Sequence, residues 1–234
     1  MAYTHLDRLQ RHFQALGFTG EAGVNAEPQD VYTLPIQGFD NSFFQAGQDL
    51  IAFGAGGVDD GEDAEVIVHE YGHAVHHAQV PGWGARHQGG AMGEGFGDFL
   101  AAVFYGREIS GGFQDTCIAD WDATSYSAAN PPCLRRADSA KKYPKGMTNS
   151  SVHSDGELWS SFLWRLRAKL GETSIEQSDN TLKLVLTSHE FLTGNAQFGD
   201  AIAALRLAAD ALGQPEWPAL IDETAAETTM PLNP

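Results

Sequence analysis

Two histidines and a glutamate that could bind and use a metal ion lie close together between Val66 and His77. His69 and His73 are four residues apart, so on a helix they share one face and lie one turn from each other. Their imidazoles could therefore bind one metal ion together. Glu70 would project beside this face, where a metal-bound water would sit. The H-E-x-x-H pattern predicts zinc (Zn²⁺) as the metal and Glu70 as general base.

A catalytic zinc site usually has three protein ligands, so a further side chain is needed. Glu94 lies in a second segment with helical spacing, and Asp98 follows one turn later on the same face. We expect Glu94 to be the third ligand and Asp98 to accept a hydrogen bond from the second ring nitrogen of His69. The alternatives are a helix that carries its histidines by chance and a solvated acidic face at Glu94 and Asp98.

The hydrophobic pattern predicts the elements that must position these residues. An acidic run at residues 59–63 supplies N-cap oxygens and favourable charge for the first ligand helix. The apolar stripe of that helix is separate from its histidines, so one face can pack in the core while the other binds metal. The second ligand helix is expected to begin near Gly93. Other helices are predicted at residues 3–16, 158–170, 181–192 and 198–212, with a single turn at 217–221.

The remaining pattern indicates an α+β fold. A short strand is predicted at residues 31–35, and residues 41–54 contain two apolar runs around a turn, as in a hairpin. Residues 107–150 form a long polar segment, which is typical of a loop that shapes a cleft. Within it, Arg135 and Arg136 are expected to be solvated at the surface, the alternative being contact with a substrate carbonyl. A local disulfide between Cys117 and Cys133 is preferred over free thiols, and neither cysteine is expected to bind zinc.

The stretch from His69 to Asp98 resembles the gluzincin metallopeptidases, most closely the thermolysin-like and fungalysin-like groups. Their pattern is H-E-x-x-H, roughly twenty residues, then E-x-x-x-D. The resemblance implies a zinc metalloendopeptidase, a hydrolase with His69, His73 and Glu94 as ligands, Glu70 as base and Asp98 behind the ligands. It also implies a zincin-like, two-lobed fold: a small mixed α/β upper lobe (1–80) with an edge strand, a mainly helical lower lobe (81–234), and the active-site helix between them.

The same resemblance extends to two other stretches. The family has an Asn-small-aromatic-aromatic strand at the edge of its cleft, so Asn41 and Ser42 would hold the substrate backbone, although a plain structural hairpin fits equally well. A His-x-x-Gly-Glu-x-Trp pattern is matched from His153 to Trp159. It implies that His153 donates a hydrogen bond to the developing oxyanion. The alternative is a surface histidine near a helix start. Asp155 is the nearest acidic residue that could orient it.

The sequence departs from the thermolysin-like pattern at two places. Those enzymes carry a tyrosine in the joint between the ligand helices, and none occurs here between Tyr71 and Tyr105. Glu65 holds the place of an acidic residue that helps bind calcium (Ca²⁺) in those enzymes, but partner carboxylates are not evident around residues 105–108. An alternative function is therefore a catalytically degenerate module in which zinc staples two helices. A metal hydrolase acting on a non-peptide bond is less favoured, because of the edge-strand candidate.

Composition limits the function further. A chain of 234 residues with 42% hydrophobic content is typical of one soluble domain. The formal net charge of −17 argues against nucleic acid or anionic membrane as a partner. Neither a membrane-spanning run nor a signal peptide is evident. The resembling families are secreted as precursors, so we expect a secreted monomer that acts on protein or peptide substrates, with a propeptide in its precursor.

Overall fold

The computed structural model describes residues 1–33, 38–105, 113–171 and 178–233. The helices in these ranges are α1 (Ala2–Ala15), α2 (Ala64–Gln79), α3 (His87–Tyr105), α4 (Val152–Lys169), α5 (Ser178–Ser188), α6 (Phe198–Ala211) and α7 (Trp217–Thr228). The strands are β1 (Asp30–Thr33), β2 (Phe43–Gln45), β3 (Leu50–Phe53), β4 (Cys117–Ile118) and β5 (Arg135–Arg136). Short 3₁₀ turns lie at Gly20–Ala22, Phe113–Thr116, Asp122–Ser125 and His189–Phe191. These elements confirm the predicted α+β class.

The larger sheet has the strand order β1-β3-β2, with β3 in the middle. β1 runs parallel to β3 with Val31 opposite Ile51, and β2 runs antiparallel with Phe44 opposite the same residue. β3 is suited to the centre because Ile51, Ala52 and Phe53 are all buried. The predicted hairpin is therefore confirmed, and β2 lies at an edge of the sheet. The strand predicted at 31–35 is observed at residues 30–33, and its last two residues lie outside the described ranges.

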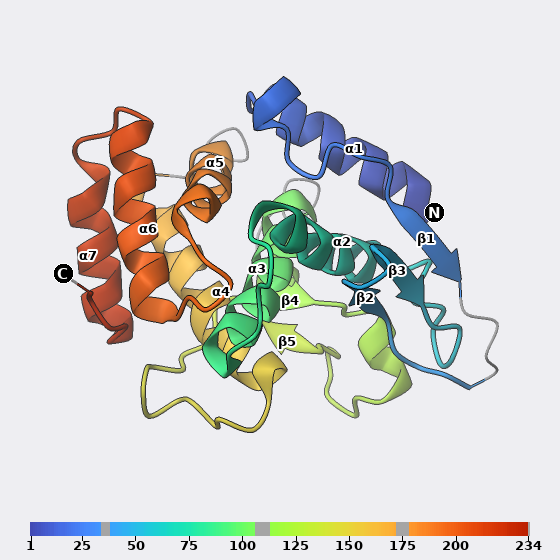
Figure 1. The fold of residues 1–234 in the computed structure, drawn as a ribbon. Coiled ribbons are helices and arrows are strands. Elements are labelled where there is room, and N and C mark those ends of the chain that lie inside the picture. Colours follow the sequence, from blue (N-terminus) through green and yellow to red (C-terminus); the bar gives the residue numbers. More distant parts are fainter. Residues whose placement is uncertain (34–37, 106–112, 172–177, 234) are drawn as a thin grey trace.

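Helix α3 runs through the middle of the molecule, between α2 and α4 (Figure 1). Glycines allow both approaches. A Cβ added to Gly72 of α2 would lie 3.0 Å from the Cα of Gly97 in α3. Toward the other neighbour, a Cβ added to Gly95 would overlap the carbonyl oxygen of Gly156 in α4. The backbones of these helices therefore approach more closely than side chains would allow, which fixes the separation between the helices.

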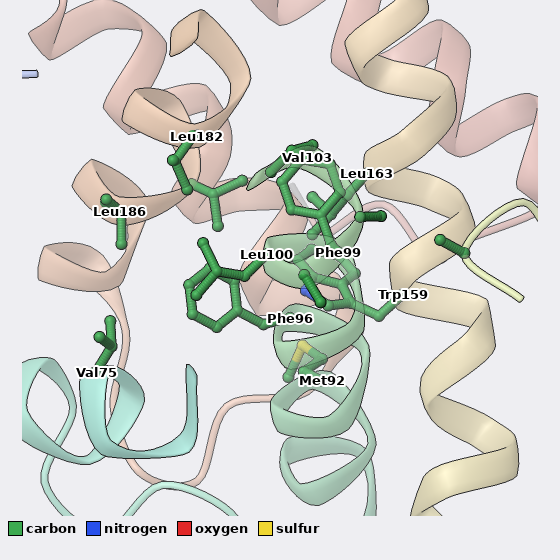
Figure 2. Close-up of a cluster of buried hydrophobic side chains, with 14 of the residues drawn as sticks. Val75, Met92, Phe96, Phe99, Leu100, Val103, Trp159, Leu163, Leu182 and Leu186 are labelled. Atoms are coloured by element: carbon green, nitrogen blue, oxygen red, sulfur yellow. The ribbon is translucent and has the colours of Figure 1, made fainter. Parts of the chain in front are cut away.

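The apolar side of α3 forms much of the hydrophobic core. Figure 2 shows its side chains meeting α2, α4 and α5, and the labelled residues are Val75, Met92, Phe96, Phe99, Leu100, Val103, Trp159, Leu163, Leu182 and Leu186. Helices α6 and α7 pack at the C-terminal end of the molecule, whereas α1 and the larger sheet lie at the other end (Figure 1). Among the described residues, no helix combines the length and apolar character needed to cross a membrane.

Three predicted helix boundaries differ from the structure by six residues or more. α4 begins at Val152 rather than at residue 158, because the Ser151 side chain caps it. α3 begins at His87 rather than near Gly93, so part of the expected joint is helical. Glycines at its start lower the helix propensity, and tertiary packing overrides that preference. α7 continues to Thr228 instead of ending after one turn at residue 221, and it stops where Thr229 adopts a left-handed backbone.

In the polar segment at residues 107–150, β4 and β5 pair antiparallel, and the predicted Cys117–Cys133 disulfide is present.

Candidate metal centre and cleft

The histidine-bearing helix begins at a well-defined cap. The carboxylate of Asp63 accepts hydrogen bonds from the backbone N–H groups of Glu65 and Val66, as the acidic run predicted. Starting α2 at this position places His69 and His73 one turn apart, toward α3. Both helices are buried along this contact, so the ligand-bearing faces are held by packing rather than by a loop.

The structure brings His69, His73 and Glu94 together. The Nε2 atom of His69 lies 3.3 Å from Glu94 Oε2, and the Nε2 atom of His73 lies 3.6 Å from Glu94 Oε1. One potential ligand atom from each of the three residues lies within 4.8 Å of the others. Ligand atoms about 2.0–2.1 Å from a tetrahedral zinc ion are about 3.3–3.4 Å from one another. The spacing and the N,N,O donor set therefore fit zinc.

A buried ion pair between Asp98 and Arg135 contacts the Nδ1 side of the His69 ring. Asp98 is fully buried and accepts a hydrogen bond from His69 Nδ1 at 2.9 Å. The guanidinium of Arg135 donates to both Asp98 oxygens, from Nη2 at 2.7 Å and from Nε at 2.8 Å. Burial alone would raise the pKa of Asp98, but Arg135 and His69 outweigh it and hold that pKa well below its usual range. The carboxylate stays ionised and directs the other nitrogen of His69 toward Glu94.

Arg135 was not recognised as part of this site, and its expected position at the solvated surface is wrong. β5 carries it beneath the ligand helices, where its side chain is only 13% exposed. A guanidinium is tolerated there because a carboxylate binds it in a bidentate manner. Arg136, on the same strand, is half-buried and pairs instead with Asp138.

Glu70 is buried at the edge of the histidine face. Its pKa is raised to about 7, chiefly by burial, while the charge of His69 opposes the rise and the Glu94 carboxylate adds to it. Its Oε2 atom has no hydrogen-bond donor within the described ranges. A carboxylate in this condition is able to accept a proton, which is what a general base must do.

The metal cluster opens into a cleft of about 950 Å³. Its lining includes the predicted zinc ligands, catalytic residues and substrate-binding residues, namely Asn41, Ser42, His69, Glu70, His73, Glu94 and His153. Asn41 and Ser42 come directly before β2, so the edge strand forms one wall. The hydroxyl of Ser42 donates to Asp60 Oδ2 at 2.6 Å and accepts from the Gly54 N–H, so its side chain is already engaged within the protein.

His153 lies in the first turn of α4, which begins at the Ser151 cap. Its side chain is 59% exposed, and its Nε2 lies 3.5 Å from Glu94 Oε2. The expectation that Asp155 orients it is wrong. Asp155 is buried and accepts hydrogen bonds from His87 Nε2 at 2.7 Å and from the backbone N–H of Thr148. Residues two apart on a helix do not face each other, so this pairing was not available.

Glu65 serves a structural contact in this structure. Its Oε2 accepts a hydrogen bond from the backbone N–H of Ala119 at 2.6 Å, and burial raises its pKa to about 8. In the described part of the chain, the carboxylates that lie close enough to share a cation are Asp40, Asp60 and Asp122, which do not include it. The sequence showed the acidic runs, but it did not show which of their members converge.

Comparison with known proteins places this chain in a metallopeptidase family. The family model described as Fungalysin metallopeptidase (M36) matches residues 55–226, and the chain belongs to this family. It is 27% identical over 141 residues to Extracellular metalloproteinase 4 of Arthroderma gypseum, a match that covers 52% of this chain and 21% of that protein. It is 30% identical over 134 residues to Extracellular metalloproteinase mep of Aspergillus terreus, covering 50% and 20% respectively. The chain thus spans about a fifth of these relatives' length.

A solved structure shows the same fold. The precursor of protealysin, a metalloproteinase from Serratia proteamaculans, matches 98% of this chain and 77% of its own with a TM-score of 0.73. The sequence identity is 14%, so the likeness concerns the fold alone. It confirms the predicted zincin-like, thermolysin-like architecture.

Proposed function

We propose that this chain is the catalytic part of a zinc-dependent endopeptidase. The observation that carries the proposal is the group formed by His69, His73 and Glu94, whose nearest ligand atoms are 3.3 and 3.6 Å apart, beside the buried base Glu70. Bound zinc would supply a Lewis acid and an activated water at the position that these ligands leave open. The cleft beside the group is bounded by an edge strand, which suits an extended peptide.

The protein residues divide the work of hydrolysis. Glu70 accepts a proton from the attacking water and passes it to the leaving amine nitrogen. His153 donates a hydrogen bond to the oxygen of the attacked carbonyl as negative charge develops there. Its exposed position at the cleft wall leaves it free to contact substrate. Asp98 and Arg135 keep His69 in one orientation throughout.

The substrate is a polypeptide that adds to the free edge of β2. β2 pairs with β3 on one side, so the groups on its other side are able to bind a substrate backbone. We assign this role to the backbone around Asn41 and Ser42 and to the Asn41 side chain, because the Ser42 hydroxyl is engaged with Asp60. Since the relatives are named extracellular and the chain contains a disulfide, we infer that the protein is secreted.

The substitution Glu70→Gln tests the mechanism. It should leave the zinc content, measured by mass spectrometry of the metal, at the wild-type value. Hydrolysis of an unfolded protein should fall by about 10²–10⁴-fold, because the base is lost while the ligands remain. Glu62→Gln is the matched control: it removes the same charge from an exposed position just before α2 and should not alter activity. Normal turnover by the Glu70→Gln variant would contradict the mechanism.

The degenerate, zinc-stapled alternative predicts a different result. The wild-type protein would then bind zinc, but it would not hydrolyse an unfolded protein in a chelator-sensitive manner. Measuring digestion with and without chelator therefore decides between an enzyme and a binding module.

A further inference from the structure

A second group of acidic side chains lies in the wall of the cleft, apart from the histidines. Asp40 precedes β2, Asp60 precedes α2, and Asp122 begins a 3₁₀ turn. One carboxylate oxygen from each of these three residues lies within 4.8 Å of the other two. The residues come from segments far apart in the sequence, so folding brings like charges together against their repulsion.

Two of these carboxylates are deeply buried and only half satisfied. Asp60 is 2% exposed and Asp122 is 5% exposed. The Oδ2 atom of Asp60 accepts from Ser42, and the Oδ2 atom of Asp122 accepts from the Tyr126 hydroxyl. The Oδ1 atoms of both residues are buried and have no hydrogen-bond donor in the part of the chain that the structure describes. A buried carboxylate oxygen without a partner is strongly destabilising, which points to a missing cation.

The local electrostatics agree with this reading. The pKa of Asp60 is raised to about 7, chiefly by burial; the hydrogen bond from Ser42 opposes the rise, and the carboxylates of Asp122 and Asp40 contribute to it. Burial likewise raises the pKa of Asp122. A proton shared between two of these groups would relieve only part of the repulsion. A divalent cation would neutralise two charges and could contact all three residues.

We propose that Asp40, Asp60 and Asp122 bind one calcium ion. The donors are all carboxylate oxygens, which calcium and magnesium prefer, whereas the N,N,O cluster of the metal centre suits zinc. Oxygens bonded to calcium at about 2.3–2.6 Å are separated by up to about 5 Å, which accommodates the observed spacing. All three ligands lie outside strands and α-helices, which suits the irregular geometry of calcium better than the strict octahedron of magnesium. The exposed side at Asp40 leaves room for water ligands.

The ion would connect three segments around the substrate wall. Asp40 is followed directly by Asn41 and Ser42, so its carboxylate anchors the entry to the edge strand. Asp60 anchors the loop that leads into α2, and Asp122 anchors the segment that follows β4. Gly57 permits this approach, since a Cβ added there would lie 2.8 Å from Asp40 Oδ2. Calcium would therefore stabilise the fold, and, if the proposed peptidase function holds, would lower KM more than it changes kcat.

Terbium binding to the zinc-loaded protein tests the site without relying on activity. Terbium(III) occupies calcium sites and emits when an adjacent aromatic ring is excited, and the Tyr126 hydroxyl touches Asp122. We expect saturable emission on excitation of the protein, reversed by added calcium. Isothermal titration should give a calcium dissociation constant on the order of 10⁻⁴ M. Calcium should also raise the unfolding temperature.

Three variants give the result its specificity. Asp122→Asn should abolish terbium emission and the calcium-dependent rise in unfolding temperature. Asp40→Asn, at an exposed position where folding is not at risk, should weaken calcium binding by about tenfold. Glu62→Gln removes one charge from the same acidic run at an exposed position outside the group and should bind calcium like the wild type.

Several outcomes would overturn the proposal. One is the absence of calcium binding by the zinc-loaded wild type at about 10 mM, well above the weakest protein sites. Another is unchanged binding in Asp40→Asn, which decides the matter even if Asp122→Asn fails to fold. A third is loss of cleavage beside lysine or arginine in Asp40→Asn without any calcium binding. That result would make the group a subsite for a basic side chain of the substrate.

Discussion

Helix α2 carries its histidines into two contrasting environments. His69 and His73 face Glu94 at the cleft, whereas His76 lies further along the helix and meets His189 in the core. The His76 and His189 Nε2 atoms are 2.9 Å apart, so one ring donates and the other accepts. The two clusters share helix α2, yet of the two only the first contains a carboxylate ligand, Glu94, beside its imidazoles.

The difference lies in the carboxylates that each cluster meets. Burial alone would lower the pKa of His69, but Asp98 and Glu94 reverse the effect and raise it to about 10. Burial lowers the pKa of His189 to about 3, and its Nδ1 pairs with the neutral Gln79 side chain rather than with a carboxylate. Helix α3 therefore decides which histidines of α2 can attract a cation.

The largest effect is expected from removing the carboxylate that distinguishes the clusters. Glu94→Ala should reduce the zinc content from about one ion per chain to near zero, and hydrolysis should disappear with it, because two imidazoles do not complete a catalytic zinc site. Metal analysis after gel filtration measures this. His189→Ala is the matched control in the second cluster and should retain zinc. Equal zinc loss from both variants would show that the two histidine clusters do not differ in metal binding as proposed.

A smaller loss is expected at His153, the exposed histidine beside Glu94. His153→Ala should leave zinc bound and reduce kcat by about 10²-fold, since one hydrogen-bond donor to the developing oxyanion is removed. Steady-state kinetics with a peptide substrate, together with zinc analysis, separates the two roles. If the variant lost zinc instead, His153 would be a metal ligand, and the ligand set assigned to the first cluster would be wrong.

The ion pair behind His69 should have a more moderate effect. Asp98→Asn should weaken zinc affinity by about 10–100-fold, because His69 loses the acceptor that fixes its ring. Competition with a chromophoric chelator measures this affinity. Arg135→Lys should preserve part of it, whereas Arg135→Gln should also lower the free energy of unfolding by about 3–5 kcal/mol, since Asp98 then stays buried without its partner. An affinity unchanged by Asp98→Asn would exclude this positioning role.

The smallest effect concerns the pH dependence of stability at the second cluster. The folded pKa of His189 lies near 3, below its ordinary value of 6.5, so the neutral ring stabilises the fold fully above about pH 6.5 and less as the pH falls toward 3. At about pH 5 the lost stability is about 2 kcal/mol. His189→Gln should flatten the decline of the unfolding temperature between about pH 7 and pH 5. A parallel decline in both proteins would contradict the role assigned to His189.

Local rules predicted much of this molecule. Helical spacing suffices to place His69 with His73, and Glu94 with Asp98, on one face of their own helices, and the two apolar runs around Gly47 suffice for the hairpin. These features depend on neighbours within one or two turns, or on a tight turn, so the sequence shows them directly. The family pattern supplied the expectation that these two helix faces meet.

The features that were missed depend on long-range contacts. A carboxylate as buried as Asp98 requires a cation, but 14 lysines and arginines were available, and pairing of β5 with β4 selected Arg135. In the same way, the acidic runs indicated charge near α2 without showing that Asp40 and Asp122 would meet Asp60. The early start of α3 was hidden because its glycines are selected for close packing rather than for helix propensity.

The glycine contacts of α3 also affect how the cleft can open. Because α3 approaches α2 at Gly97 and α4 at Gly95 with backbone against backbone, sliding of these helices would bring residues larger than glycine into those contacts, which opposes shear. Any widening that admits a bulky peptide must therefore come from the facing wall around β2 and the turn at Asp122. If the helices that carry the ligands stay fixed while the wall around β2 moves, the protein could bind peptides of varied sequence without changing the spacing of its metal ligands.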